Sequence, residues 1–156
     1  MFAVNHLIGF GAGGAGADLY SVIQSAGLTS GLQTCLDAGA GASYSSGNKW
    51  LDLSGNGQDF NLGSESASAS TGDEPAFTGS AGGLSSGEYF LHTNGDEFFQ
   101  YDTSNETWMT GLHKDGATFT LLAALYFGGS SNGTILGSAR TESTARQGII
   151  FDISSG

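Results

Sequence analysis

Glycine is the residue that most limits what this chain can fold into, because it occupies 27 of the 156 positions and recurs along the whole length. A glycine inside a helix or strand weakens that element, so long uninterrupted elements are disfavoured. Together with serine and threonine, glycine makes up 61 of the residues. The sequence therefore predicts short elements separated by many turns.

A hydrophobic core can still form. The hydrophobic share is 38% and there are seventeen aromatic residues, whereas disordered chains are poor in aromatics. The length fits one domain, and Cys35 is the only cysteine, so no intrachain disulfide is possible. We expect a folded domain that does without a disulfide.

The charge balance excludes two classes of partner. Fifteen acidic residues against four basic ones give a formal net charge of −11. Neutralising nucleic-acid phosphates or binding an anionic membrane requires clustered lysine and arginine. The N-terminus has no basic residue before its apolar stretch, which is not typical of a secretion signal. We expect no nucleic-acid or membrane partner, and synthesis in a cytoplasm.

Residues 1–31 differ in composition from the rest of the chain. Their only charged side chain is Asp18, and most of the other residues are glycine, alanine or apolar. The stretch 17–26 could form about two helical turns, with Gly27 ending them. Such a segment buries little surface alone, so we predict that residues 1–31 form a Gly-rich extended N-terminal arm with at most a short helix.

From Leu32 onward, short apolar runs alternate with turn residues. The runs are rich in β-branched and aromatic residues and are bounded by Gly, Asn, Asp or Ser, which indicates strands. They span residues 32–38, 49–53, 60–63, 76–80, 87–93, 96–102, 117–127, 133–138 and 148–154. Strands at a spacing of roughly ten residues are typical of a sandwich. We predict an all-β domain over residues 32–156.

A glycine string near the N-terminus offers an alternative interpretation. Residues 11–16 satisfy the dinucleotide-binding pattern G-x-G-x-x-G, and Asp37 follows at the distance expected of a ribose-binding acid. That site also needs a helix packed on a parallel sheet with later βα units, and no helical period follows Asp37. A nucleotide-binding oxidoreductase is therefore the least favoured of three functional hypotheses.

The turn after residue 51 suggests a metal site. Asp52, Ser54 and Asn56 alternate as oxygen donors, and Gly57 takes the sixth position of an EF-hand loop. The twelfth position, which should be glutamate, is Gly63. An EF-hand is therefore not expected. A looser Ca²⁺ site formed by Asp52, Asn56 and Asp59 is the alternative to a tight turn whose side chains bind backbone donors.

No catalytic constellation emerges from the remaining polar residues. Asp96, Glu97, Asp102 and Glu106 are close in sequence, but neighbours on a strand point to opposite faces. Surface solvation is the simpler interpretation. The histidines, at positions 6, 92 and 113, share no zinc-ligand spacing with one another or with the cysteine. The chain also lacks the nucleophile elbow G-x-S-x-G. We therefore expect no enzymatic activity and no cofactor apart from Ca²⁺.

Several of these segments together resemble the concanavalin A-like lectin/glucanase superfamily, in the laminin-G-like form common in phage fibre and tail proteins. The matching segments are LDAGAGASY (36–44), KWLDLSGNGQDFNLG (49–63), PAF (75–77), GEYFL (87–91), TFTLLAALYF (118–127), GTILGS (133–138) and GIIFDIS (148–154). The start, NHLIGFGAGGAG, looks like the N-termini of phage minor structural proteins. The resemblance implies a jelly-roll β-sandwich over residues 32–156.

Two departures qualify that resemblance. The E-x-D-x-E strand that supplies the catalytic residues of the glucanase members has no counterpart in this sequence. The resemblance therefore does not imply hydrolytic activity. Family domains usually continue past the strand GIIFDIS, so the sandwich is expected to be incomplete at its C-terminal end. Either neighbouring copies complete it or the chain belongs to a longer fibre.

The leading hypothesis is a non-enzymatic virion protein of a tailed phage, such as a head or tail fibre, spike or decoration component. Residues 1–31 would anchor it to capsid or tail proteins, and several copies would assemble as a homo-oligomer. The second hypothesis is a lectin module that binds host-surface glycans. In that case Tyr44, Trp50 and Trp108 are the aromatic residues expected to stack on sugar rings.

Overall fold

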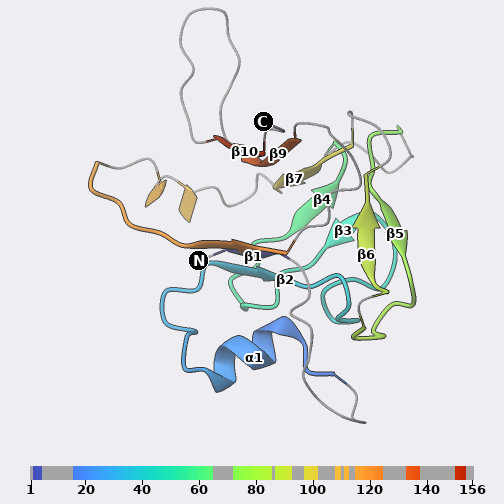
Figure 1. Ribbon diagram of the computed structural model, residues 1–156, viewed down its shortest axis with the longest axis horizontal. Coiled ribbons are helices and arrows are strands. Elements are labelled where there is room, and N and C mark those ends of the chain that lie inside the picture. Colours follow the sequence, from blue (N-terminus) through green and yellow to red (C-terminus); the bar gives the residue numbers. More distant parts are fainter. Residues whose placement is uncertain are drawn as a thin grey trace, which may run out of the picture. The chain divides into compact units, whose positions relative to one another are not determined.

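The computed structural model describes residues 2–4, 16–64, 72–85, 87–92, 97–101, 108–109, 111–112, 115–124, 133–137 and 150–153. These residues are mostly β, with one short helix (Figure 1). The elements are β1 (Phe2–Val4), α1 (Leu19–Ser25), β2 (Thr34–Leu36), β3 (Lys49–Trp50), β4 (Phe60–Leu62), β5 (Ala76–Thr78), β6 (Tyr89–Leu91), β7 (Phe99–Tyr101), β8 (Leu121–Ala123), β9 (Gly133–Gly137) and β10 (Ile150–Ile153). No helix in this part of the chain has the length and apolar character needed to cross a membrane.

The chain divides into two compact units. The first contains Met1–Glu106 and Phe119–Leu125, and the second contains Thr107–Thr118 and Tyr126–Gly156. In the second unit β9 pairs antiparallel with β10, with a register shift between Phe151 and Asp152. Such a shift marks a bulge, which bends a strand locally.

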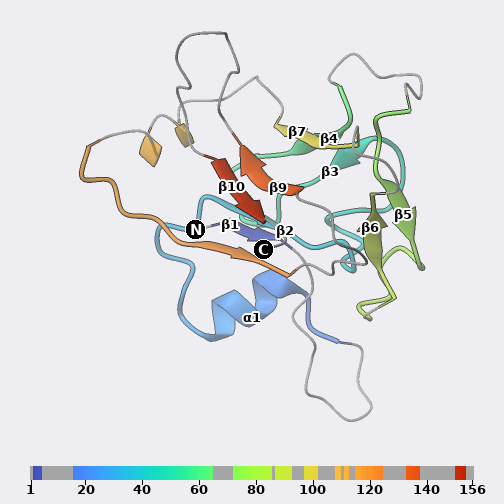
Figure 2. The same ribbon diagram turned by 45° about the horizontal axis from the view of Figure 1, so that its top comes forward.

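The described residues of the first unit form three small sheets (Figure 2). One has the order β3-β4-β7 and another pairs β5 with β6, and both are antiparallel. The third has the order β2-β1-β8, with β1 parallel to both neighbours. The all-β expectation is thus confirmed in its coarse form, whereas no closed sandwich is seen among the described strands.

Helix α1 lies within the stretch 17–26 that the sequence predicts to be helical. Asp18 is the N-cap, and its side chain accepts a hydrogen bond from Ser21 N at 2.6 Å. Gly27 has a φ of +70°, a left-handed conformation that ends a helix at little cost for glycine. Leu19 and Ile23 are buried on the face toward β2. The helix is therefore stabilised by packing on the sheet strand rather than by its own length.

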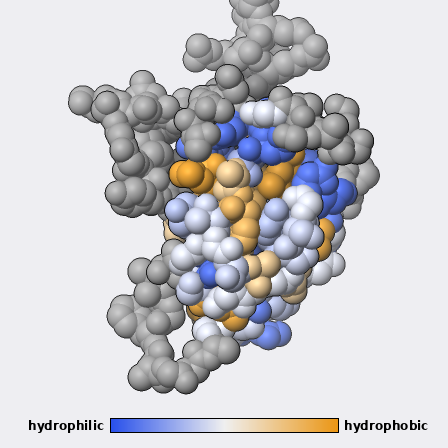
Figure 3. Space-filling model, turned by 90° about the vertical axis from the view of Figure 1, so that its right-hand side faces the viewer, coloured by the Kyte–Doolittle hydropathy of each residue, from blue (hydrophilic) through white to orange (hydrophobic). Residues whose placement is uncertain are grey.

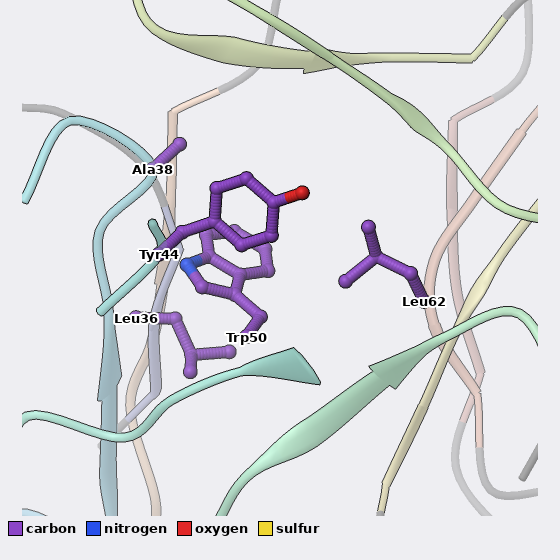
Figure 4. Packing of buried hydrophobic residues seen from close by; sticks show 5 residues of the cluster. All are labelled: Leu36, Ala38, Tyr44, Trp50 and Leu62. Atoms are coloured by element: carbon purple, nitrogen blue, oxygen red, sulfur yellow. The ribbon is translucent and has the colours of Figure 1, made fainter. Parts of the chain in front are cut away.

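Helix α1 and β2 share a small core cluster of Leu19, Ile23, Leu32 and Cys35. A second, larger cluster contains Leu36, Ala38, Tyr44, Trp50 and Leu62 (Figure 4). Phe60, Phe77, Phe90 and Phe99 pack around the second cluster. Strand β2 contributes to both clusters, because Cys35 and Leu36 point to opposite faces of the strand.

Each of the nine predicted strand segments contains a strand, but the observed strands are shorter. The apolar run 117–127 forms β8 only at Leu121–Ala123 within its described residues 117–124. Strand β1 was not predicted, because the sequence expectation for its region was an extended arm. Apolar side chains also remain exposed on β6, at Tyr89 and Leu91, and Figure 3 shows an apolar band on the side where β5 and β6 lie.

Candidate functional site

The turn that follows β3 holds the residues singled out as a Ca²⁺ site. Gly55 and Gly57 have φ values of +84° and +69°, so the chain reverses through conformations that favour glycine. This reversal returns the chain toward β4, which pairs antiparallel with β3. The turn thereby surrounds the Asp52 side chain with backbone groups.

Both oxygens of Asp52 accept several hydrogen bonds. Oδ1 accepts from Cys35 N at 2.8 Å, Ser54 N at 2.9 Å and Thr34 Oγ1 at 3.3 Å. Oδ2 accepts from Ser54 Oγ at 2.6 Å and Gln58 N at 3.1 Å. A carboxylate that accepts N–H groups from two separate segments ties them together. Asp52 thus joins its own turn to β2.

Asn56 and Asp59 complete this turn. Asn56 Nδ2 donates to Leu32 O at 2.9 Å, Gln33 O at 3.0 Å and Ser54 Oγ at 3.0 Å. Asp59 Oδ1 accepts from the backbone N of residue 52 at 2.9 Å. Asn56 therefore presents its amide nitrogen, a donor, toward the protein.

Through these hydrogen bonds, the three predicted metal ligands stabilise the turn itself. The structure places Asp52, Asn56 and Asp59 in one turn, as the sequence indicates. A Ca²⁺ ion takes about six to eight oxygen ligands, but here the lone pairs of Asp52 face N–H and O–H donors. Within the described segments, no group of three or more His, Cys, Asp or Glu residues could hold a metal ion. The turn is arranged to bind backbone donors.

A buried polar network extends from this turn to β7. Gln58 and Tyr101 are 5% and 9% exposed, and the Tyr101 hydroxyl donates to Gln58 Oε1. Thr34 Oγ1 also lies 3.3 Å from Gln58 O. Burying a polar group is costly unless it is hydrogen-bonded, so this network fixes the spacing of β2, the turn and β7. Gln58 was not predicted as a buried residue, because nothing in its local pattern marks a buried glutamine.

Cys35 lies beside the network and is fully buried. Burial, together with the negative charges of Asp52, Asp37 and Asp18, raises the pKa of its thiol from the ordinary 9.0 to about 12. The thiolate is the reactive form of cysteine. Cys35 is therefore an apolar core residue at neutral pH.

The aromatic residues proposed to stack on sugars have different positions. Tyr44 and Trp50 are 8% and 3% exposed. The ring of Tyr44 lies 4.8 Å from that of Phe77, and the ring of Trp50 lies 4.8 Å from those of Phe90 and Phe99. These contacts cover the ring faces that a sugar would need, so we assign both residues to the core. Trp108 belongs to the second unit, where it is half-buried.

Glu88 organises the connection between β5 and β6. Its carboxylate accepts from Ser85 N at 2.6 Å, Ser85 Oγ at 2.7 Å and Ser80 N at 3.3 Å. The hydroxyl of Ser85 and the backbone donors lower the pKa of Glu88 below its ordinary 4.5, while burial acts in the opposite direction. A side chain added at Gly83 would come within 2.4 Å of Glu88 Oε1. The loop therefore folds around this carboxylate.

Asp37, the acid of the dinucleotide interpretation, also binds backbone groups. Its Oδ2 accepts from Leu19 N at 2.8 Å and its Oδ1 from Gly39 N at 2.9 Å. Asp37 is fully buried, so it joins the first turn of α1 to the end of β2 rather than facing a ligand. Of the glycine string, Gly16 is described, and residues 11–15 lie outside the described part of the chain.

Of the other residues considered in the sequence, His92 and Glu97 are described. His92 Nδ1 lies 3.1 Å from Glu97 O, and its ring packs 5.4 Å from that of Phe99. The remaining histidines and acidic candidates, at positions 6, 96, 102, 106 and 113, lie outside the described residues. Comparison with protein-family models, with curated proteins and with solved structures finds no match to this chain.

Proposed function

We propose that this chain is a non-enzymatic structural protein of a tailed-phage virion, serving as a head or tail fibre, spike or decoration component. In this proposal the body is a jelly roll of the concanavalin A-like type. Residues 1–31 anchor it to capsid or tail proteins, and several copies assemble on the particle. The protein is made in the host cytoplasm and then resides in the virion.

The observation that carries the proposal is the use of acidic side chains in the first unit. Asp37, Asp52, Asp59 and Glu88 each accept hydrogen bonds from backbone N–H groups. A catalytic or metal-binding carboxylate needs free lone pairs toward its ligand. Carboxylates that instead hold turns together support a scaffold built of short strands and glycine turns.

The sequence segment with the strongest resemblance also supports the proposal. WLDLSGNG forms part of β3 and the turn centred on Asp52, which is hydrogen-bonded to β2. Trp50 from the same segment enters the larger core cluster. The segment that suggests the superfamily is therefore also the one that organises the first unit.

Incorporation into particles tests this proposal. Full-length chain and a variant in which a Gly-Ser linker of equal length replaces residues 5–15 are supplied during infection, and purified particles are examined by mass spectrometry. The replacement keeps β1, Asp18 and the contacts of α1 with β2. We expect full-length protein in the particles and the variant, folded by circular dichroism, in the soluble fraction. Absence of the full-length chain from particles would refute the proposal, and equal incorporation of both would refute the anchoring role.

A further inference from the structure

We propose that Asn56 and Gly57, in the turn between β3 and β4, form a site of spontaneous deamidation, and that the carboxylate it creates releases this turn from the segment leading into β2. The reaction is hydrolysis of a side-chain amide, with water as the co-reactant. The site is a property of the turn, and it does not depend on whether the chain belongs to a virion.

The dipeptide has the local features that this reaction requires. Glycine has no side chain to obstruct its backbone nitrogen as that nitrogen approaches the side-chain carbonyl carbon of the preceding asparagine. Asn56 and Gly57 are both exposed, so water reaches them. A Cβ at Gly55 or Gly57 would meet no described atom within 4 Å beyond its chain neighbours. There is therefore room for the turn to shift locally and bring the two reacting atoms together.

The covalent steps balance with water alone. Gly57 N attacks Asn56 Cγ, which closes a cyclic succinimide, and the bond from Cγ to Nδ2 breaks. The proton from Gly57 N and the NH₂ group leave together as ammonia. Water then adds to either succinimide carbonyl and breaks its bond to the ring nitrogen, which gives isoaspartate or aspartate. No electrons are exchanged, so neither an oxidant nor a reductant is needed.

The Asn56 amide acts as a donor in the folded turn. Its Nδ2 lies 2.9 Å from Leu32 O, 3.0 Å from Gln33 O and 3.0 Å from Ser54 Oγ. Leu32 and Gln33 directly precede β2, so this nitrogen joins the turn to the start of that strand. An ionised carboxylate accepts hydrogen bonds but has no proton to donate. Deamidation would therefore set a negatively charged oxygen against two carbonyl oxygens.

The neighbouring hydroxyl does not compensate for this loss. Ser54 Oγ has one proton, and it already donates to Asp52 Oδ2 at 2.6 Å. The new carboxylate would be the third in the turn, after Asp52 and Asp59, in a chain with only four basic residues. Like charges in one turn repel each other. The aspartate product should therefore separate the turn from residues 32 and 33.

The isoaspartate product disturbs the same turn through the backbone. Isoaspartate carries its chain through the former side chain, which adds one carbon to the backbone at residue 56. This position lies between Ser54 and Gln58, whose backbone N–H groups donate to Asp52 at 2.9 Å and 3.1 Å. A longer backbone changes the separation of these two donors. Both products therefore weaken the hydrogen bonds that hold the turn together.

The reaction is followed in the full-length wild-type chain, incubated folded and in urea at mildly alkaline pH. Peptide mapping by mass spectrometry measures the conversion of each asparagine. Asn48, which precedes Lys49 rather than glycine, is the internal control. Asn-Gly also occurs at 94–95 and 132–133, where the asparagines lie outside the described residues, and the mapping resolves these sites separately.

We expect conversion at Asn56 in the folded chain and several-fold faster conversion in urea, because the hydrogen bonds of Nδ2 restrain the side chain while the turn is closed. Asn48 should remain unconverted over the same time. Absence of conversion at Asn56 in the folded chain, during a period in which the unfolded chain converts, would overturn the proposal.

The substitution Asn56→Asp isolates the effect of the product on the fold. Its folding equilibrium constant, measured by urea denaturation, should be lower than that of wild type by about tenfold or more, because two carbonyl oxygens lose their donor. Gln24→Glu makes the same change from amide to carboxylate on the exposed face of α1 and should lower the constant about twofold or less. Equal losses in the two variants would refute release of the turn.

A second measurement covers the case in which Asn56→Asp fails to fold. Ion exchange separates the aged wild-type chain by its added charge, and peptide mapping selects the fraction converted at Asn56. Hydrogen exchange should be faster in this fraction at Cys35 N and Leu53 N, whose bonds to Asp52 Oδ1 and Cys35 O join the turn to β2. Exchange in β5 and β6 should not change. Unchanged exchange at both Cys35 and Leu53 would show that deamidation leaves the turn in place.

Discussion

At the scale of single residues, buried and half-buried carboxylates hold the turns of the first unit. Asp37, Asp52 and Glu88 each bridge backbone donors that lie apart in the sequence. Hydrogen bonds to a charged acceptor are stronger than neutral ones. In a chain with few basic residues, these bonds take the place of ion pairs in compensating buried negative charge.

Asp52 gives the clearest test at this scale. Asp52→Ala leaves the fully buried N–H of Cys35 without its side-chain acceptor, so we expect the free energy of unfolding to fall by about 1–3 kcal/mol. Urea denaturation measures the loss. Asp115→Ala, which removes an exposed carboxylate, should change stability by no more than about 0.5 kcal/mol. Equal effects of the two variants would contradict the structural role of Asp52.

Glu88 predicts how stability depends on pH. Its pKa is lowered in the folded protein, chiefly by the Ser85 hydroxyl, so its contribution is present above the ordinary 4.5 and is lost as pH falls through the folded value. The stability difference between wild type and Glu88→Gln should therefore shrink as pH falls from 7 toward 3. Ser85→Ala should raise the pKa of Glu88 and move that loss to higher pH. A difference that grows on acidification would refute this assignment.

At the scale of elements, local signals specified α1 better than they specified the strands. The helical period of residues 17–26 and the stop at Gly27 are local signals, so the sequence placed the helix within two residues of its observed ends. The N-cap Asp18 was not predicted. Strand β1 depends on residues 34–36 and 121–123, which are far away in sequence. No local pattern contains that information.

The docking of α1 can be measured through a core residue. Leu19→Ala removes a buried side chain from the cluster with Ile23 and Cys35, and we expect a loss of about 2–5 kcal/mol. The same variant should expose Cys35 to a thiol reagent under native conditions. Gln24→Ala, on the exposed face of the helix, should leave both stability and thiol protection unchanged. An unreactive Cys35 in Leu19→Ala would show that the helix does not protect it.

The aromatic cluster joins elements that are separate in sequence. Trp50 of β3 contacts Phe90 of β6 and Phe99 of β7, so one side chain links three of the strands. Trp50→Ala should therefore cost about 3–5 kcal/mol in thermal or chemical unfolding. Leu51→Ala, at a position 41% exposed, is the matched control and should cost much less. A loss below about 1 kcal/mol for Trp50→Ala would place the ring outside the core.

At the scale of the whole molecule, composition predicted the class of fold. Contacts between residues far apart in sequence decided how the elements pack together, and these were not predictable. Glycine frequency and short apolar runs indicated small strands, which the structure contains. The turn around Asp52 was predictable, because Asp, Ser and Asn beside glycine are typical turn residues. Its hydrogen bonds to β2 were not, because Cys35 and Thr34 give no local sign of that partner.

The candidate site, too, was predictable from the sequence only in part. The sequence identified Asp52, Asn56 and Asp59 as neighbours, and the structure confirms that they share one turn. The backbone N–H groups that donate to Asp52 and Asp59 are placed by the path of the chain, which residue types alone do not reveal. Burial of Tyr44 and Trp50 likewise follows from phenylalanines on β5, β6 and β7.

Cryo-electron microscopy of purified particles shows whether the chain is a virion component. We expect density on the head or tail that fits the first unit and continues from residues 1–31 into a neighbouring virion protein. Density for α1 packed on β2 would identify the chain within the map. Particles that contain no copy of the chain, or copies that contact the particle only through another part of the chain, would contradict this expectation.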